Sequence, residues 1–111
     1  MPFQVDVVAP EGMVWSGEAD LVVARTVEGE LGIMADHEPL MASLATGAVA
    51  IVRGDDRLEI GVHGGFLQVV ENQVTLLTDR AQVAEGGRAE ALEVAEELAE
   101  QPTFEEGFGA V

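Results

Sequence analysis

Apolar and polar residues alternate along several short stretches of the chain. Residues 3–8, 48–53 and 57–62 show the period of two that is typical of a half-buried β-strand. Turns rich in Gly, Asp and Asn separate these stretches at close spacing, which favours a sandwich or barrel over alternating strands and helices. We therefore predict a mainly β fold, with an antiparallel β-sandwich of about nine or ten short strands in residues 1–84.

Three stretches of this region need individual interpretation. Residues 40–46 suit either a strand or one helical turn, and we favour a strand because a glycine and another strand follow at once. The His63-Gly64-Gly65 segment is interpreted as a tight turn or bulge between two strands, at 57–62 and 66–70. Residues 74–78 are the last clear strand.

The composition changes near Glu85. Gly86 and Gly87 form a hinge, and residues 88–101 are helix-forming throughout. Their apolar stripe is Ala91, Val94, Ala95 and Leu98, widened by Leu92 and Ala99. We predict a second unit at 85–111, with one helix at 88–101 that lies against the β domain or a partner, and an acidic, mobile tail.

Charge narrows the classes of partner. The chain has 21 acidic and five basic residues, for a net charge of -16. This balance excludes nucleic-acid binding and direct docking on anionic lipid, both of which need clustered cations. The acidity either keeps the chain soluble or steers a basic protein toward it. No apolar stretch reaches the ~20 residues of a membrane span, and no signal peptide is visible, so we expect no membrane insertion and a cytoplasmic location.

Candidate catalytic and metal-binding residues are few. His37 lies between Asp36 and Glu38, but adjacent side chains of an extended segment point to opposite sides. His63 is the only other histidine, and the chain has no cysteine. We expect no metal, no cofactor and no active site. An enzyme with a metal centre at the two histidines is a minor alternative.

Three motifs in a fixed order carry a resemblance to a known family. They are Gly29-Glu30-Leu31-Gly32-Ile33, His37-x-Pro39-Leu40 and Val62-x-Gly64-Gly65-Phe66. Further matches, such as Val14-Trp15-Ser16-Gly17, extend the likeness over residues 3–81. With these motifs the chain resembles the epsilon subunit of rotary ATP synthases.

The resemblance implies a non-catalytic subunit of the central stalk. Such a subunit links the gamma subunit to the membrane c-ring and modulates ATP synthesis and hydrolysis during proton transport. It implies a peripheral position on the cytoplasmic face of the cell membrane. The residues that match the c-ring-facing segment of the family are Glu30, Leu31, Gly32, Asp36, His37 and Glu38.

The C-terminal region departs from the family pattern. Only one helix fits here, whereas many members have two. The resemblance implies that this C-terminal helix contacts the catalytic alpha/beta head. Some members bind ATP through a segment of the type Ile/Leu-Asp-x-x-Arg-Ala, which this chain matches only in part. The candidate nucleotide-binding residues in this degenerate segment are Glu85 and Arg88. The alternative to the rotor subunit is a stand-alone acidic β-sandwich that binds a protein, and affinity for a gamma subunit discriminates between the two.

Overall fold

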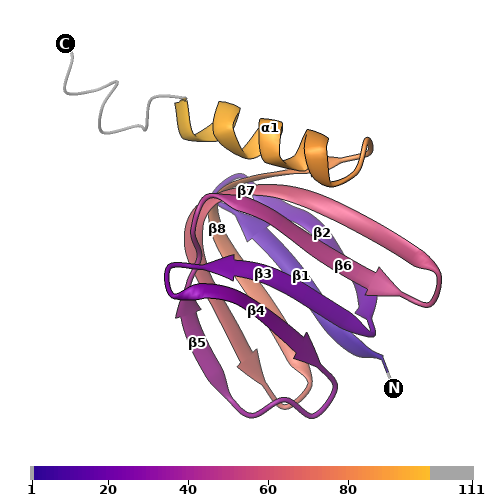
Figure 1. Ribbon diagram of the computed structural model, residues 1–111. Coiled ribbons are helices and arrows are strands. Elements are labelled where there is room, and N and C mark those ends of the chain that lie inside the picture. The colour runs from indigo at the N-terminus through magenta and orange to yellow at the C-terminus, as the bar shows by residue number, and fades with distance from the viewer. Residues whose placement is uncertain (1, 101–111) are drawn as a thin grey trace.

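The computed structural model describes residues 2–100, which form eight strands and one helix (Figure 1). The elements are β1 (Phe3–Ala9), β2 (Gly12–Ala19), β3 (Leu21–Thr26), β4 (Gly29–Met34), β5 (Leu40–Ser43), β6 (Gly47–Arg53), β7 (Asp56–Val70), β8 (Gln73–Ala84) and α1 (Arg88–Glu100). The predicted mainly β fold with one C-terminal helix is confirmed, as is the strand that begins at Leu40. The predicted mobile tail lies outside the described residues.

A long hairpin of β7 and β8 organises the sandwich. The strands are hydrogen-bonded in the order β2-β1-β8-β7-β6-β3-β4, and β5 also pairs with β7. The first half of β7 pairs with β6 and its second half pairs with β5. The sheet therefore folds over along this hairpin into two layers that face each other (Figure 1).

Two details of the predicted sandwich are wrong. The stretches 57–62 and 66–70 belong to the single strand β7, so Gly64 and Gly65 do not form a turn or a bulge that separates two strands. The β1–β8 pair is parallel, so the sheet is not wholly antiparallel. These two strands lie far apart along the chain, and no short hairpin dictates their relative direction.

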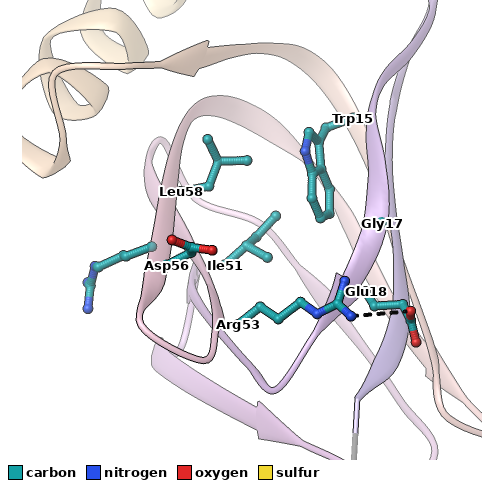
Figure 2. Close-up of a pocket in the computed structure, with 8 residues that line it drawn as sticks. Trp15, Gly17, Glu18, Ile51, Arg53, Asp56 and Leu58 are labelled. Atoms are coloured by element: carbon teal, nitrogen blue, oxygen red, sulfur yellow. Dashed lines mark ion pairs between the residues drawn. The ribbon is translucent and has the colours of Figure 1, made fainter.

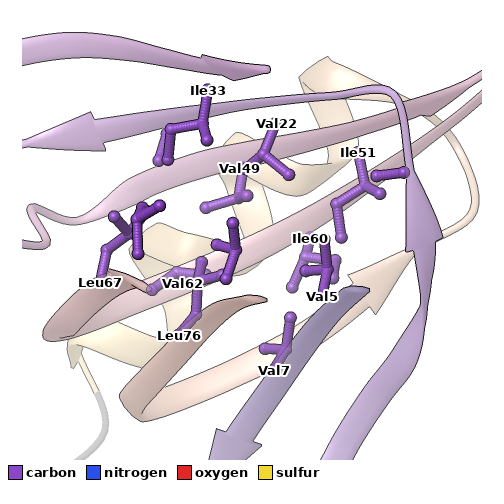
Figure 3. Close-up of a cluster of buried hydrophobic side chains, with 14 of the residues drawn as sticks. Val5, Val7, Val22, Ile33, Val49, Ile51, Ile60, Val62, Leu67 and Leu76 are labelled. Atoms are coloured by element: carbon purple, nitrogen blue, oxygen red, sulfur yellow. The ribbon is translucent and has the colours of Figure 1, made fainter. Parts of the chain in front are cut away.

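The core lies between the two layers and consists of aliphatic side chains (Figure 3). Its fully buried members include Val5, Val7, Val22, Ile33, Val49, Ile60, Val62, Leu67 and Leu76. On β7 the buried side chains change from even positions, such as Ile60, to odd positions, such as Leu67. The change occurs at Gly64 and Gly65, whose φ angles are 71° and 111°. These glycines let the strand exchange its faces while its pairing with β8 continues on both sides.

Helix α1 lies across the outer face of β6, β7 and β8 (Figure 1). It buries the predicted stripe of Ala91, Val94, Ala95 and Leu98. Leu92 and Ala99, which were predicted to widen this stripe, are exposed. Contact with the sheet is close because the sheet offers small residues: a Cβ added to Gly61 would lie 2.6 Å from the Ala91 carbonyl oxygen. The Arg80 guanidinium donates a hydrogen bond to the Leu98 carbonyl near the negative end of the helix.

Candidate interaction surfaces

The first group of predicted c-ring-facing residues, 30–32, lies on β4, which is an edge strand of the sheet. Glu30 and Gly32 are exposed, whereas Leu31 is half-buried and packs against the core. Glu30 pairs in register with Arg25 of β3. This part of the edge therefore presents a carboxylate and open backbone.

The second group lies in the loop between β4 and β5. The Asp36 backbone N–H donates to Asn72 Oδ1 at 2.6 Å, and Asp36 Oδ1 accepts from Asn72 Nδ2 at 3.1 Å. His37 is half-buried, with Nδ1 2.7 Å from the Glu38 carbonyl oxygen, and Glu38 is exposed. The Asn72 contacts hold this loop beside the turn between β7 and β8.

The two groups are separated along the edge of the sandwich. The hairpin turn and Glu30 lie at one end of β4, and the loop of Asp36 and His37 lies at the other. The strand is six residues long, which corresponds to about 20 Å of extended chain. A single small contact does not reach both groups, so any surface that includes them runs along the whole edge.

The sequence analysis missed an exposed row of apolar side chains on the outer face of the sandwich. The row consists of Met13, Val8, Leu77 and Phe66, which are neighbours in register across β2, β1, β8 and β7. Val8 is half-buried, and the other three are exposed. The exposed fractions of Phe66 and Leu77 are 52% and 48%. The alternation along β7 could have revealed this apolar row, because Phe66 is out of phase with the buried residues Leu67 and Val69.

A polar cluster lies beside the apolar row and is centred on Asp6. Its carboxylate accepts hydrogen bonds from Ser16 Oγ at 2.6 Å and from the amides of Gln4 and Gln73, each at 3.0 Å. The hydrogen bond from Ser16, followed by that from Gln4, lowers the pKa of Asp6 from its ordinary value of 3.8. Because the folded state favours the ionised carboxylate, this cluster stabilises the fold above that pH and loses its contribution as the pH falls through the lowered pKa.

We predict that Asp6→Asn makes the fold less sensitive to acid. The fall in the free energy of unfolding between pH 5 and pH 2, measured by urea titration, is smaller in the variant than in the natural chain. Since other acids contribute equally to both proteins, the difference isolates Asp6. An identical fall in both proteins contradicts the prediction.

A cleft of about 400 Å³ opens between β2 and the hairpin of β6 and β7 (Figure 2). Trp15, Ile51 and Leu58 form its apolar lining, and an ion pair of 3.7 Å between Arg53 and Glu18 lies at its edge. Trp15 is half-buried and packs against the core. The only tryptophan is thus a rim aromatic of the sandwich.

The two histidines do not share a site. His63 lies on β7, where its Nδ1 is 2.8 Å from Thr46 Oγ1, whereas His37 contacts its own loop. Within residues 2–100, no three His, Cys, Asp or Glu side chains are grouped as metal ligands. In the same range no helix is long and apolar enough to cross a membrane.

The candidate nucleotide-binding residues flank the turn into α1. Glu85 and Arg88 are both exposed. Between them, Gly87 has a φ of 89°, and the Gly86 N–H donates to the Glu90 carboxylate. The helix therefore begins only at Arg88, and Glu85 stands outside it.

Comparison with known proteins now decides the family. Residues 2–84 match the family described as ATP synthase, Delta/Epsilon chain, beta-sandwich domain. This chain belongs to the ATP synthase epsilon chain family. The ATP synthase epsilon chain of Alkalihalophilus pseudofirmus is 43% identical over 97 residues, a match that covers 87% of this chain and 73% of that one.

Solved structures share the fold. A chain of the Euglena gracilis mitochondrial ATP synthase, OSCP/F1/c-ring in rotational state 1, aligns with a TM-score of 0.67 at 23% identity, covering 95% of this chain and 70% of that one. A chain of the Tetrahymena thermophila mitochondrial ATP synthase central stalk/c-ring aligns with a TM-score of 0.61 at 16% identity, covering 70% and 63%.

Family membership settles the class of function. The chain is a non-catalytic, accessory epsilon subunit of an ATP synthase. The exposed surfaces described above are therefore candidates for contact with other subunits and not for catalysis.

Proposed function

We propose that this epsilon chain joins the gamma subunit to the c-ring loops on the cytoplasmic face of the cell membrane. In this position it couples proton-driven rotation to ATP synthesis and restrains ATP hydrolysis. The apolar row carries the proposal, since a contiguous exposed apolar surface on a folded domain marks a protein contact. A sandwich with a second, polar edge can then bind another subunit at the same time.

The apolar row is the proposed seat for the gamma subunit. Its four side chains cross four neighbouring strands and are framed by the polar cluster of Asp6. This arrangement of an apolar centre with a polar rim is that of a typical stable protein interface.

The edge formed by β4 and the following loop is the proposed c-ring contact. Glu30, Asp36 and Glu38 are exposed carboxylates there, and they complement cationic loops of a partner. Such rim charges guide association and orientation more than they add affinity. Helix α1, on a different part of the surface, is the proposed modulator of the catalytic head, and Glu85 and Arg88 are proposed as remnants of a nucleotide-binding segment.

The proposed gamma seat predicts the behaviour of Leu77→Asp. The substitution places a charge at the centre of the row on a side chain that is half exposed, so the fold is retained. We expect the affinity for the gamma subunit of the same organism to fall about 100-fold, as for a charge in an interface core. Co-elution and titration calorimetry measure it.

A control and a truncation complete this experiment. Glu11→Lys changes an exposed turn and leaves the affinity unchanged. A chain that ends at Glu85 still binds, since the row lies entirely in the sandwich. If neither the natural chain nor the truncated chain binds gamma, the proposed gamma contact is wrong and the apolar row faces another partner.

The proposed c-ring contact predicts that binding to the c-ring can be weakened while binding to the gamma subunit is kept. Glu30→Ala with His37→Ala leaves gamma binding intact, because both residues lie away from the apolar row. We expect the complex with gamma to bind isolated c-rings several-fold more weakly, most clearly at low salt, where screening is smallest. Unchanged ring binding at low salt removes these residues from the contact.

A further inference from the structure

The side chain of Asn72 links two turns that lie far apart in the sequence. Its Oδ1 accepts a hydrogen bond from the Asp36 backbone N–H at 2.6 Å, and its Nδ2 donates to Asp36 Oδ1 at 3.1 Å. The carbonyl oxygen of Asn72 accepts from the Gln4 N–H, near the start of β1, at 3.2 Å. Asn72 thus joins the turn between β7 and β8 to β1 and to the loop between β4 and β5, although it is not among the predicted c-ring-facing residues.

Both members of this pair have an uncommon backbone conformation. The φ angles of Asp36 and Asn72 are 63° and 62°. These angles lie in the left-handed region, which aspartate and asparagine tolerate better than most residues that carry a side chain. Such conformations persist where surrounding contacts determine them. The two hydrogen bonds between the Asn72 side chain and Asp36 are contacts of this kind, so they fix the loop and the turn to each other.

The link restrains the loop that carries His37 and Glu38. The two ends of the loop are held by β4 and β5. Pro39 fixes its own φ and limits the conformations of Glu38 before it. The hydrogen bonds to Asn72 add an attachment in the middle of the loop, directly before His37. His37 and Glu38 are therefore held in place before any partner binds.

We propose that Asn72 is a positioning residue for the c-ring contact. Its amide presets the loop through Asp36, so that His37 and Glu38 lose little conformational freedom when a c-ring loop binds. A segment that is ordered in advance binds more tightly than one that must be ordered by its partner. The inference rests on the proposed c-ring contact and adds to it a residue that acts through another one.

The link requires one amide and one carboxylate. Asn72→Asp removes the amide donor and brings two carboxylates to the distance of the present hydrogen bond, where like charges repel. The exchanged variant, Asp36→Asn with Asn72→Asp, provides a donor at position 36 and keeps an acceptor for the backbone N–H at position 72. Both positions are exposed, both residue types tolerate the left-handed region, and the exchange leaves the net charge unchanged. The exchanged variant is therefore the matched control for the single substitution.

Binding of the complex with gamma to isolated c-rings at low salt tests the positioning role. We expect Asn72→Asp to weaken ring binding about tenfold, the order of the cost of immobilising one or two side chains at an interface. The exchanged variant restores ring binding. Affinity for gamma stays unchanged in both variants, because about 13 Å of β8 separates its first residue from Leu77 of the apolar row.

Amide NMR spectra of the free full chain report the loop without the ring. We expect the signals of His37 and Glu38 to shift or broaden in Asn72→Asp and to return in the exchanged variant, while those of the core strands stay in place. Unchanged loop signals in Asn72→Asp overturn the proposal, because the amide would then not hold the loop.

The ring measurements separate this proposal from the one on which it rests. Ring binding that Asn72→Asp leaves intact, while Glu30→Ala with His37→Ala weakens it, overturns the positioning role and keeps the proposed contact. Equal weakening in the single and the exchanged variant also overturns the role, since a restored hydrogen bond would then have no effect. If none of these variants alters ring binding, the proposed contact is wrong and the positioning role is wrong with it.

Discussion

Gly65→Val is expected to unfold most of the protein or to lower its free energy of unfolding by about 3–5 kcal/mol. The φ angle of Gly65 is 111°, which a β-branched residue does not adopt without strain. A Cβ there would lie 2.0 Å from the Leu77 carbonyl oxygen and 2.7 Å from Thr78 Cα. Both obstacles are backbone atoms of the paired strand β8, so no side-chain movement relieves the clash. Urea unfolding followed by Trp15 fluorescence measures the loss.

Gly54→Ala is the matched control for this prediction. Gly54 also has a positive φ, 59°, but a Cβ at that position has no heavy atom within 4 Å. It therefore tests backbone strain without a clash, and we expect a loss of only about 1 kcal/mol. If the two variants are equally stable, Gly65 does not have the role assigned to it at the change of faces in β7.

Gly61→Val is expected to detach α1 while the sandwich remains folded. The added side chain would meet the Ala91 carbonyl oxygen at 2.6 Å, Val94 Cγ1 at 2.8 Å and the Ala95 amide at 3.0 Å. Two of these atoms belong to the helix backbone, so the helix must move away as a body. Overpacking of this kind costs about 1–3 kcal/mol, which shifts the docking equilibrium roughly 10- to 100-fold. A helix of 13 residues is marginal by itself in water.

Circular dichroism and hydrogen exchange measure this effect. We expect the far-UV helix signal to fall and the amides of α1 to lose protection, with the unfolding midpoint of the sandwich nearly unchanged. Gly32→Val, on the edge strand β4, is the control, because a Cβ added to Gly32 would lie 3.9 Å from its nearest neighbour, Leu21 Cδ1. A helix that stays equally protected in both variants would show that α1 does not depend on the close approach at Gly61.

The apolar row and the docked helix divide the surface of the subunit between two tasks. The row lies on the outer face of β2, β1, β8 and the end of β7, whereas α1 covers β6 and the other halves of β7 and β8. The exchange of faces at Gly64 and Gly65 separates them. A helix can therefore leave the sandwich without disturbing the proposed seat for gamma.

Local patterns were sufficient for much of the fold. The alternation in residues 3–8 and 48–53 predicted strands, because a strand with one buried face repeats every two residues. The stripe from Ala91 to Leu98 predicted the buried side of α1 for the equivalent reason in a helix. The Gly-Glu-Leu-Gly-Ile and His-x-Pro-Leu motifs predicted the family, which the comparisons confirmed.

The errors lie where distant segments decide the outcome. The sequence analysis predicted a turn or bulge at Gly64 and Gly65, since glycines readily adopt the positive φ that is typical of turns. Pairing along the whole of β8 instead keeps β7 continuous through them. The parallel pairing of β1 with β8 has no local signal at all, because it joins strands from opposite ends of the domain.

The strand and helix periods, the acidic charge and the family follow from residue types at short spacing, so they could be predicted from the amino-acid order. Which segment covers each buried face depends on contacts that form in the folded protein. The fold aligns Met13, Val8, Leu77 and Phe66 into one row on the outer face, and it places α1 in close contact with Gly61 of β7. Both arrangements follow from strand register and helix docking, which are set by contacts between residues far apart in the chain.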